Sequence, residues 1–198
     1  MHMSSVFWLA AGLVAVTATG IMLARDWRWN LGLMSAQYLG AAVLASAHWP
    51  IGMAAAFLVT GWMSTAALGM TLSGLPPQFE FTERAWPQGR LFRVFMVGMI
   101  FVLAVGLTSR SGTFSAGAEA PVVAGSILLA GIGLLQLGTT AQVARVLLGL
   151  LTVLSGFEVF YAAVEGSILV AGLLSVVTLG LGLAGAYLLS ASIAEETE

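Results

Sequence analysis

The sequence contains no cysteine and no lysine, and its only histidines are His2 and His48. Without cysteine, the chain has no disulfide, no cysteine-ligated iron–sulfur cluster, no c-type haem attachment and no thiol nucleophile. Because His2 lies at the extreme N-terminus, the two histidines cannot hold a haem inside a helical bundle. The absence of lysine excludes a retinal Schiff base, so the chain is not a rhodopsin. We therefore expect no cofactor and no metal site.

Charged residues are scarce as well. They make up 8% of the 198 residues, whereas hydrophobic residues make up 59%. A soluble domain has about 25% charged residues, so this chain could not cover a water-exposed surface. The net charge of −2 gives no indication of nucleic-acid binding. The composition predicts an all-α, polytopic integral membrane protein whose solvent is the lipid bilayer.

Seven apolar stretches are long enough to cross a bilayer, which takes about 20 residues within a range of about 17–25. The first is not expected to be a signal peptide, because no basic region precedes it and no polar domain follows it. The sequence therefore predicts seven transmembrane helices. They cover residues 5–24, 30–47, 51–73, 91–108, 121–138, 142–164 and 167–193.

Arginine residues set the expected orientation. One side of the predicted bundle holds six arginines at loops and helix ends, whereas the other side holds only Arg110. Arginine near helix ends stays on the cytoplasmic side of a membrane. We therefore expect a multi-pass protein of the cell inner membrane, with its N-terminus outside and its C-terminus in the cytoplasm. The six are Arg25, Arg28, Arg84, Arg90, Arg93 and Arg145.

The longest loop covers residues 74–90 and lies on the arginine-rich side. Its prolines, Pro76, Pro77 and Pro87, exclude a continuous helix. Its aromatic and charged residues predict a segment in the cytoplasmic interface, either an ordinary interfacial loop or a docking surface for a partner. On the opposite border we expect Trp8 and Trp49, because tryptophan is enriched at membrane–water interfaces.

Two pairs of apolar stretches share a pattern. Gln37 and Glu158 are each followed, at the same distance, by Ala-Ala-Val, and Thr65 and Thr178 each precede a glycine by four residues. A gap between the two pairs is needed to align them. We expect a parallel repeat within a single membrane domain, residues 1–198, because a fourth helix between two triplets makes both insert in the same orientation. The units are residues 1–73 and 121–198, joined by the interfacial loop and a linking helix in residues 74–120.

Residues 154–164, which read LSGFEVFYAAV, carry a resemblance to a known family. They resemble the second helix of the K subunit of respiratory complex I and are similar to the C subunit of Mrp-type cation/proton antiporters. That family has a Gly-x-Glu core followed by an Ala-Val step. Its third helix has a Glu four residues before Gly-Leu-Ala; here residues 182–184 match, and Thr178 takes the Glu position. A duplicated form with one extra helix resembles the E-type membrane subunit of hydrogenase-4 and formate hydrogenlyase complexes.

The resemblance implies a non-catalytic membrane subunit of a proton- or cation-translocating redox or antiporter complex. Its partners would be other membrane subunits, among them a large antiporter-like subunit, and not nucleic acid. The family's buried glutamates lie on a chain of charged groups across the membrane. Here Glu158 is the only acid among the four equivalent positions, and we expect no catalytic residue. The proton-relay candidates are Glu158, Gln37, Thr178 and Thr65.

Other interpretations remain open for Glu158, the one carboxylate deep in an apolar stretch. Such a group costs about 2.5–3.5 kcal/mol to insert and usually faces the bundle interior. It could conduct protons, or it could only pack in a structural or assembly subunit of another membrane complex. A free-standing small transporter is the third class, although a substrate path generally needs more polar lining.

Two further patterns concern helix packing. Gln37 and Gln136 lie in apolar surroundings, which predicts hydrogen bonds between helices. Residues 180–185 read GLGLAG and match the dinucleotide fingerprint, but no strand precedes them. Because they lie within an expected spanning helix, we interpret these small residues as points of close helix approach.

Overall fold

The computed structural model describes residues 2–24, 26–74, 90–109 and 119–196. Within these ranges the chain forms seven α-helices and no strand, so the all-α prediction is confirmed. Each helix coincides closely with one of the seven predicted apolar stretches. The helices are α1 His2–Leu23, α2 Trp27–Ala45, α3 Ile51–Ser73, α4 Arg90–Thr108, α6 Ala120–Thr139, α7 Val143–Val164 and α8 Ile168–Glu196.

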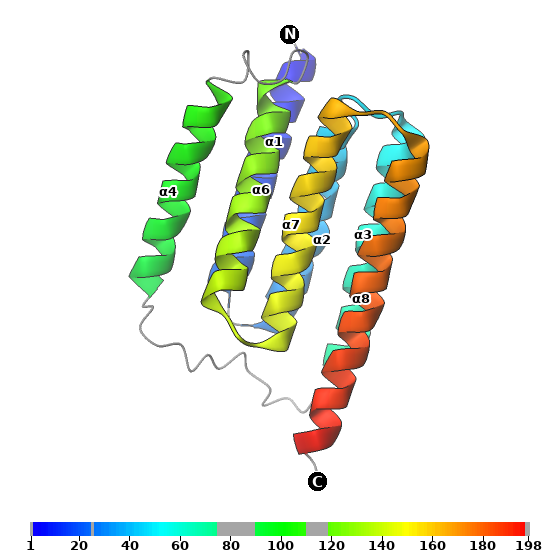
Figure 1. Cartoon of the computed structure of the whole chain (residues 1–198). Coiled ribbons are helices and arrows are strands. Elements are labelled where there is room, and N and C mark those ends of the chain that lie inside the picture. Colours follow the sequence, from blue (N-terminus) through cyan, green and yellow to red (C-terminus); the bar gives the residue numbers. More distant parts are fainter. Residues whose placement is uncertain (1, 25, 75–89, 110–118, 197–198) are drawn as a thin grey trace.

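The helices form two layers. One layer holds α1, α2 and α3, the other holds α6, α7 and α8, and α4 lies at the edge beside α6 (Figure 1). Helix α1 packs against α6, α2 against α7, and α3 against α8. Within each of these pairs the two helices run in the same direction, and the two termini lie at opposite ends of the bundle (Figure 1). The two triplets therefore share one orientation.

Among the described residues, six helices are long and apolar enough to cross a membrane, and α2 is not one of them. Helix α2 has 19 residues and carries Arg28, Asn30 and Gln37. It lies in the interior, in contact with α1, α3, α6 and α7. Neighbouring helices bury Asn30 and Gln37, whereas Arg28 is exposed at the start of the helix, so the middle of α2 needs less apolar character than a lipid-facing helix.

The start of α2 differs from the prediction. The helix begins at Trp27 instead of residue 30, because the Asp26 side chain accepts a 3.0 Å hydrogen bond from the backbone N–H of Arg28 and caps the helix. Trp49 lies in the connection between α2 and α3, at one end of the bundle. Its ring is buried, and its indole N–H donates a 3.1 Å hydrogen bond to the Glu165 carbonyl oxygen. This bond joins the α2–α3 connection to the α7–α8 connection.

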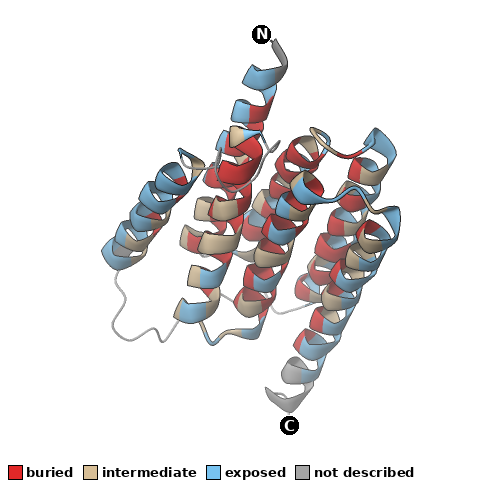
Figure 2. Cartoon of the chain, turned by 45° about the horizontal axis from the view of Figure 1, so that its top comes forward, coloured by how far each residue is buried: buried red, intermediate tan, exposed pale blue. Residues whose placement is uncertain are grey.

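The outer surface is apolar. Helix α4 exposes most of its residues, with Leu91 87% and Val102 75% exposed, and Figure 2 shows it as the least buried helix. Such a surface suits lipid and not water. The bundle is thus compatible with a multi-pass membrane protein.

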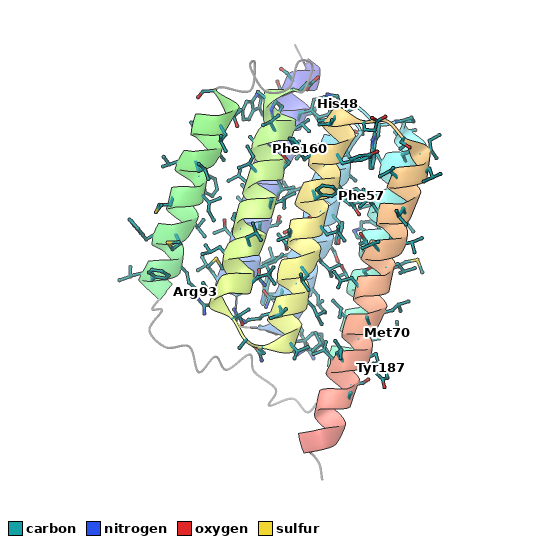
Figure 3. The ribbon with its side chains drawn as sticks, viewed as in Figure 1. His48, Phe57, Met70, Arg93, Phe160 and Tyr187 are labelled. Atoms are coloured by element: carbon teal, nitrogen blue, oxygen red, sulfur yellow. The ribbon has the colours of Figure 1, made fainter. Side chains whose placement is uncertain are left out.

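Described arginines gather at the end away from the N-terminus. Arg28, Arg93 and Arg145 lie near the first residues of α2, α4 and α7, and Figure 3 shows Arg93 at the opposite end from His48. The predicted interfacial segment lies outside the described residues, apart from its two ends, as do Arg25, Arg84 and Arg110.

Candidate functional site

Four helices close into a ring in one half of the bundle. Helix α2 contacts α3, α3 contacts α8, α8 contacts α7, and α7 contacts α2. We call this arrangement the four-helix ring. Besides Asn30 and Arg145 at the arginine-rich end, eight side chains with polar groups are buried along its helices, none more than 4% exposed, and we call these eight the polar cluster. They are Gln37, Tyr38, Ser64, Thr65, Thr152, Ser155, Glu158 and Thr178.

Glu158 and Thr178 meet across the contact between α7 and α8. The Thr178 hydroxyl donates a 2.7 Å hydrogen bond to Glu158 Oε1. Glu158 is 2% exposed, so its carboxyl lies in the protein interior and not in lipid. The structure thus brings two of the four predicted relay candidates into direct contact.

Gln37 bridges α2 and α7. Its amide Nε2 lies 3.3 Å from Thr152 Oγ1 and 3.4 Å from Ser155 Oγ, and it donates to both. The predicted role of Gln37 in helix–helix hydrogen bonding is confirmed. Both hydroxyls also donate to carbonyl oxygens of α7, at Leu148 and Thr152 respectively. Gln37 therefore joins a hydroxyl-lined stretch of α7 that leads towards Glu158.

Thr65, the fourth candidate, serves its own helix. Its hydroxyl donates a 2.8 Å hydrogen bond to the Gly61 carbonyl oxygen. The neighbouring Ser64 makes the contact between helices instead, with a 3.0 Å hydrogen bond to the Thr178 carbonyl oxygen. Ser64 thus reaches the backbone of the same residue whose side chain binds Glu158.

Three buried polar atoms of the cluster have no hydrogen-bond partner. They are Glu158 Oε2, Gln37 Oε1 and the Tyr38 hydroxyl. Tyr38 also interacts electrostatically with Glu158, which places the two groups in one electrostatic environment. Buried polar atoms without partners are uncommon in proteins, and they mark positions where a proton, a water molecule or an ion can bind.

Glycines allow the helices of this region to approach closely. A Cβ atom at Gly61 would collide with the Tyr38 ring, which packs between α2 and α3 and makes an edge contact with Phe57 at 5.6 Å between centroids. On residues 180–185, a Cβ atom at Gly182 would lie 2.6 Å from Ser64 Cβ. A Cβ atom at Gly185 would lie 2.6 Å from Leu147 Cδ2, whereas one at Gly180 would meet nothing within 4 Å. The interpretation as points of close helix approach is therefore confirmed for Gly182 and Gly185 and is wrong for Gly180.

Sequence patterns did not single out Tyr38, Ser64, Thr152 or Ser155. A signal was present for two of them. Thr152 precedes Ser155 by three residues and Ser155 precedes Glu158 by three, and residues three apart are neighbours on a helix surface. Tyr38 and Ser64 offer no such signal, because their positions depend on how α2 and α3 pack.

A second polar group lies at the arginine-rich end of the bundle. Arg145 is 3% exposed, and its Nη2 donates a 3.0 Å hydrogen bond to the carbonyl oxygen of Ala24, just after α1. Asn30 donates to the same oxygen at 3.5 Å, and Gln136 Nε2 donates to the Arg145 carbonyl oxygen at 2.9 Å. The helix–helix role predicted for Gln136 is confirmed. These bonds tie the ends of α1, α6 and α7 together.

Comparison with known proteins adds no relative. The chain matches no protein-family model, no curated protein and no solved structure.

Proposed function

We propose that this protein is a non-catalytic membrane subunit of a proton- or cation-translocating redox or antiporter complex. Glu158 would lie on a buried polar path through the four-helix ring, beside an antiporter-like partner subunit. The observation that carries the proposal is the buried carboxyl of Glu158, which is bound by Thr178 on one oxygen and has no partner on the other.

A relay group must accept a proton from one neighbour and release it to another. Glu158 Oε1 faces the Thr178 hydroxyl, and Oε2 is free to take a proton or to bind water. On the α2 side, Gln37, Thr152 and Ser155 supply a hydrogen-bonded row of an amide and two hydroxyls. Hydroxyls both donate and accept, so such a row suits proton transfer through ordered water. Glu158 lies three residues after Ser155 on the same helix, and it is the only carboxyl group of the polar cluster.

A structural subunit is the second candidate function, and one observation favours it. The Thr178 hydroxyl already gives Glu158 a hydrogen bond between α7 and α8. A group that only packs needs one such bond. In that case Glu158 would join the two helices and would neither gain nor lose a proton.

Glu158→Gln separates these functions. Glutamine keeps an oxygen that can accept the Thr178 hydrogen bond, but it cannot carry a proton. The complex is purified from membranes of cells that express the variant, and translocation is measured in membrane vesicles per amount of intact complex. A relay predicts intact assembly with reduced translocation.

The matched control is Glu165→Gln. Glu165 ends the same helix but is exposed, and its carbonyl group makes the bond to Trp49. We expect full translocation from this control. Full translocation in Glu158→Gln as well would assign Glu158 a structural role and would make the second candidate the leading one.

We further propose that the bundle lies in the cell inner membrane with seven crossings, its N-terminus outside and its C-terminus in the cytoplasm. Support for the orientation comes from Arg28, Arg93 and Arg145, which lie near the starts of their helices at the end away from the N-terminus. Seven crossings require α2 to span as an interior helix.

The parallel repeat is also part of the proposal. The shared direction of the two triplets supports it, as does the pairing of each helix with its counterpart. In a duplicated protein, Gln37 and Glu158 occupy equivalent positions of the two units, and only the second unit has an acidic residue there.

A further inference from the structure

An apolar cleft lies between α1, α4 and α6, away from the four-helix ring. Its volume is about 520 Å³, and it is lined by residues 8–15 of α1, 101–109 of α4 and 120–128 of α6. Small side chains make most of this lining, and a Cβ atom at Gly12 would have no neighbour within 4 Å. The cleft is thus an open space beside the packed core.

The cleft extends along only part of the bundle. At about 1.5 Å per residue, each lining segment rises roughly 10–12 Å. Half of a hydrocarbon core of about 30 Å is about 15 Å, so the cleft has the depth of a single leaflet. Its lining runs from Trp8, Ser109 and Ala120, towards the N-terminal end of the bundle, to Ala15, Ala104 and Leu128, which form a small buried cluster that we call its floor.

Below this floor, α4 closes onto the bundle. A Cβ atom at Gly131 of α6 would lie 2.8 Å from Ile100 Cγ2 of α4, and Val97 is 5% exposed in the main core. Arg93 Nη1 donates a 3.5 Å hydrogen bond to the Met22 carbonyl oxygen at the end of α1. A transmembrane helix of a partner is about 10 Å wide and crosses both leaflets, so it cannot lie along a cleft that ends at mid-depth.

The lining is almost entirely apolar, and its polar groups, the Trp8 indole and the hydroxyls of Thr108 and Ser109, lie at the end where the cleft begins. The Thr108 hydroxyl donates a 2.6 Å hydrogen bond to the Ala104 carbonyl oxygen, and the Ser109 hydroxyl donates a 2.9 Å hydrogen bond to the Gly106 carbonyl oxygen. Both are turned to their own helix at the mouth of the cleft. An occupant therefore needs a hydrocarbon body inside, with any polar head outside at the membrane surface.

We propose that this cleft binds one acyl chain of a phospholipid from the leaflet on the N-terminal side. The chain would pass between Trp8 and Ser109 and end at the floor near Ala15 and Ala104. The inference requires the bundle to lie in a bilayer, but it does not depend on the role of Glu158.

The test is photolabelling in vesicles. The protein is reconstituted into vesicles of phosphatidylethanolamine and phosphatidylglycerol that contain a phospholipid with a diazirine on its acyl chain. After illumination, labelled residues are mapped by mass spectrometry. We expect adducts on Ala15 and Ala104, which are only 6% and 2% exposed, in addition to adducts on outward-facing residues.

Gly12→Phe fills the cleft and should lower the labelling of Ala15 and Ala104 severalfold, and Gly12→Leu should lower it less. Gly172→Phe is the matched control, because a Cβ atom there also has no neighbour within 4 Å but lies on the exposed face of α8. This control should leave the labelling of the cleft unchanged. Adducts on outward-facing α8 residues report in every variant that the protein is folded and inserted.

Two results would overturn the proposal. One is labelling of Ala15 and Ala104 in Gly12→Phe at the level of the unmodified protein. The other is labelling confined to outward-facing residues in the unmodified protein, which would mean that the cleft is closed to lipid or filled by protein.

Discussion

Thr178 and Glu158 are bound to each other across the contact between α7 and α8, by a hydrogen bond of 2.7 Å from hydroxyl to carboxyl. No other side chain among the described residues donates to the Glu158 carboxyl. The bond therefore fixes where the only acid of the polar cluster points, and it is the first target for substitution.

Thr178→Val removes the hydroxyl and keeps the side-chain shape. Because Glu158 Oε1 then loses its donor in a buried site, we expect a loss of stability of about 1–3 kcal/mol. Thermal unfolding of the purified protein in detergent measures the change. Thr178→Ser keeps a hydroxyl and should therefore retain most of the stability. Thr60→Val is the control, because the exposed Thr60 hydroxyl binds only the Ala56 carbonyl oxygen of its own helix. Equal melting temperatures for Thr178→Val and the unmodified protein would contradict the importance of this bond.

Gln37→Leu should have a smaller effect, although Gln37 is buried as deeply. Its two partners, Thr152 and Ser155, keep their hydrogen bonds to carbonyl oxygens of α7. The variant also removes Oε1, which has no partner. Side-chain hydrogen bonds between membrane helices contribute on average about 0.6 kcal/mol, so we expect a loss below about 1 kcal/mol. A larger loss than that of Thr178→Val, measured in the same unfolding assay, would show that the α2–α7 bridge dominates the cluster.

Gly61→Ala tests the close contact between α2 and α3. The new methyl group would collide with the Tyr38 ring, which is itself held by Phe57, so the helices must separate. Overpacking of this kind costs about 1–3 kcal/mol. Gly106→Ala is the control, because a Cβ atom at that position meets nothing within 4 Å. In thermal unfolding, Gly61→Ala should melt at a lower temperature than the unmodified protein, and Gly106→Ala should not. An unchanged melting temperature for Gly61→Ala would mean that the Tyr38 ring can move aside.

The orientation can be tested with single cysteines, since the chain has none of its own. Cysteine at Gln78, in the loop on the arginine-rich side, should resist a membrane-impermeant thiol reagent in intact cells and react after lysis. Cysteine at Gly166, in the connection between α7 and α8 at the other end, should react in intact cells. The reverse pattern would invert the proposed topology.

The sequence predicted the helices well, because six of the seven lie on apolar stretches long enough to be recognised without knowledge of the packing, and α2 lies on a less apolar one. It placed the start of α2 three residues late, because the capping role of Asp26 depends on one local hydrogen bond. It did not predict that the Trp49 ring is buried, because the partner of its indole N–H, the Glu165 carbonyl oxygen, lies far away in the sequence.

The candidate site was predicted only in part. Glu158 and Gln37 were recognisable as polar residues in apolar stretches, and both are buried. The contact between Glu158 and Thr178 was not predictable from their spacing alone. The arrangement of Tyr38 against Gly61, and of Ser64 against Thr178, depends on the packing of α3 with α2 and α8. No pattern within a single helix contains that information.

The interior position of α2 has a consequence for biosynthesis. Gln37 finds its hydroxyl partners 115 and 118 residues later in the chain. When α1 to α3 have left the ribosome, α7 has not yet been made, so the amide must wait in a half-built bundle without its partners. During that interval α2 has only its contacts with α1 and α3 to hold it in place. Completion of α7 is then the step that locks the first half of the protein in place.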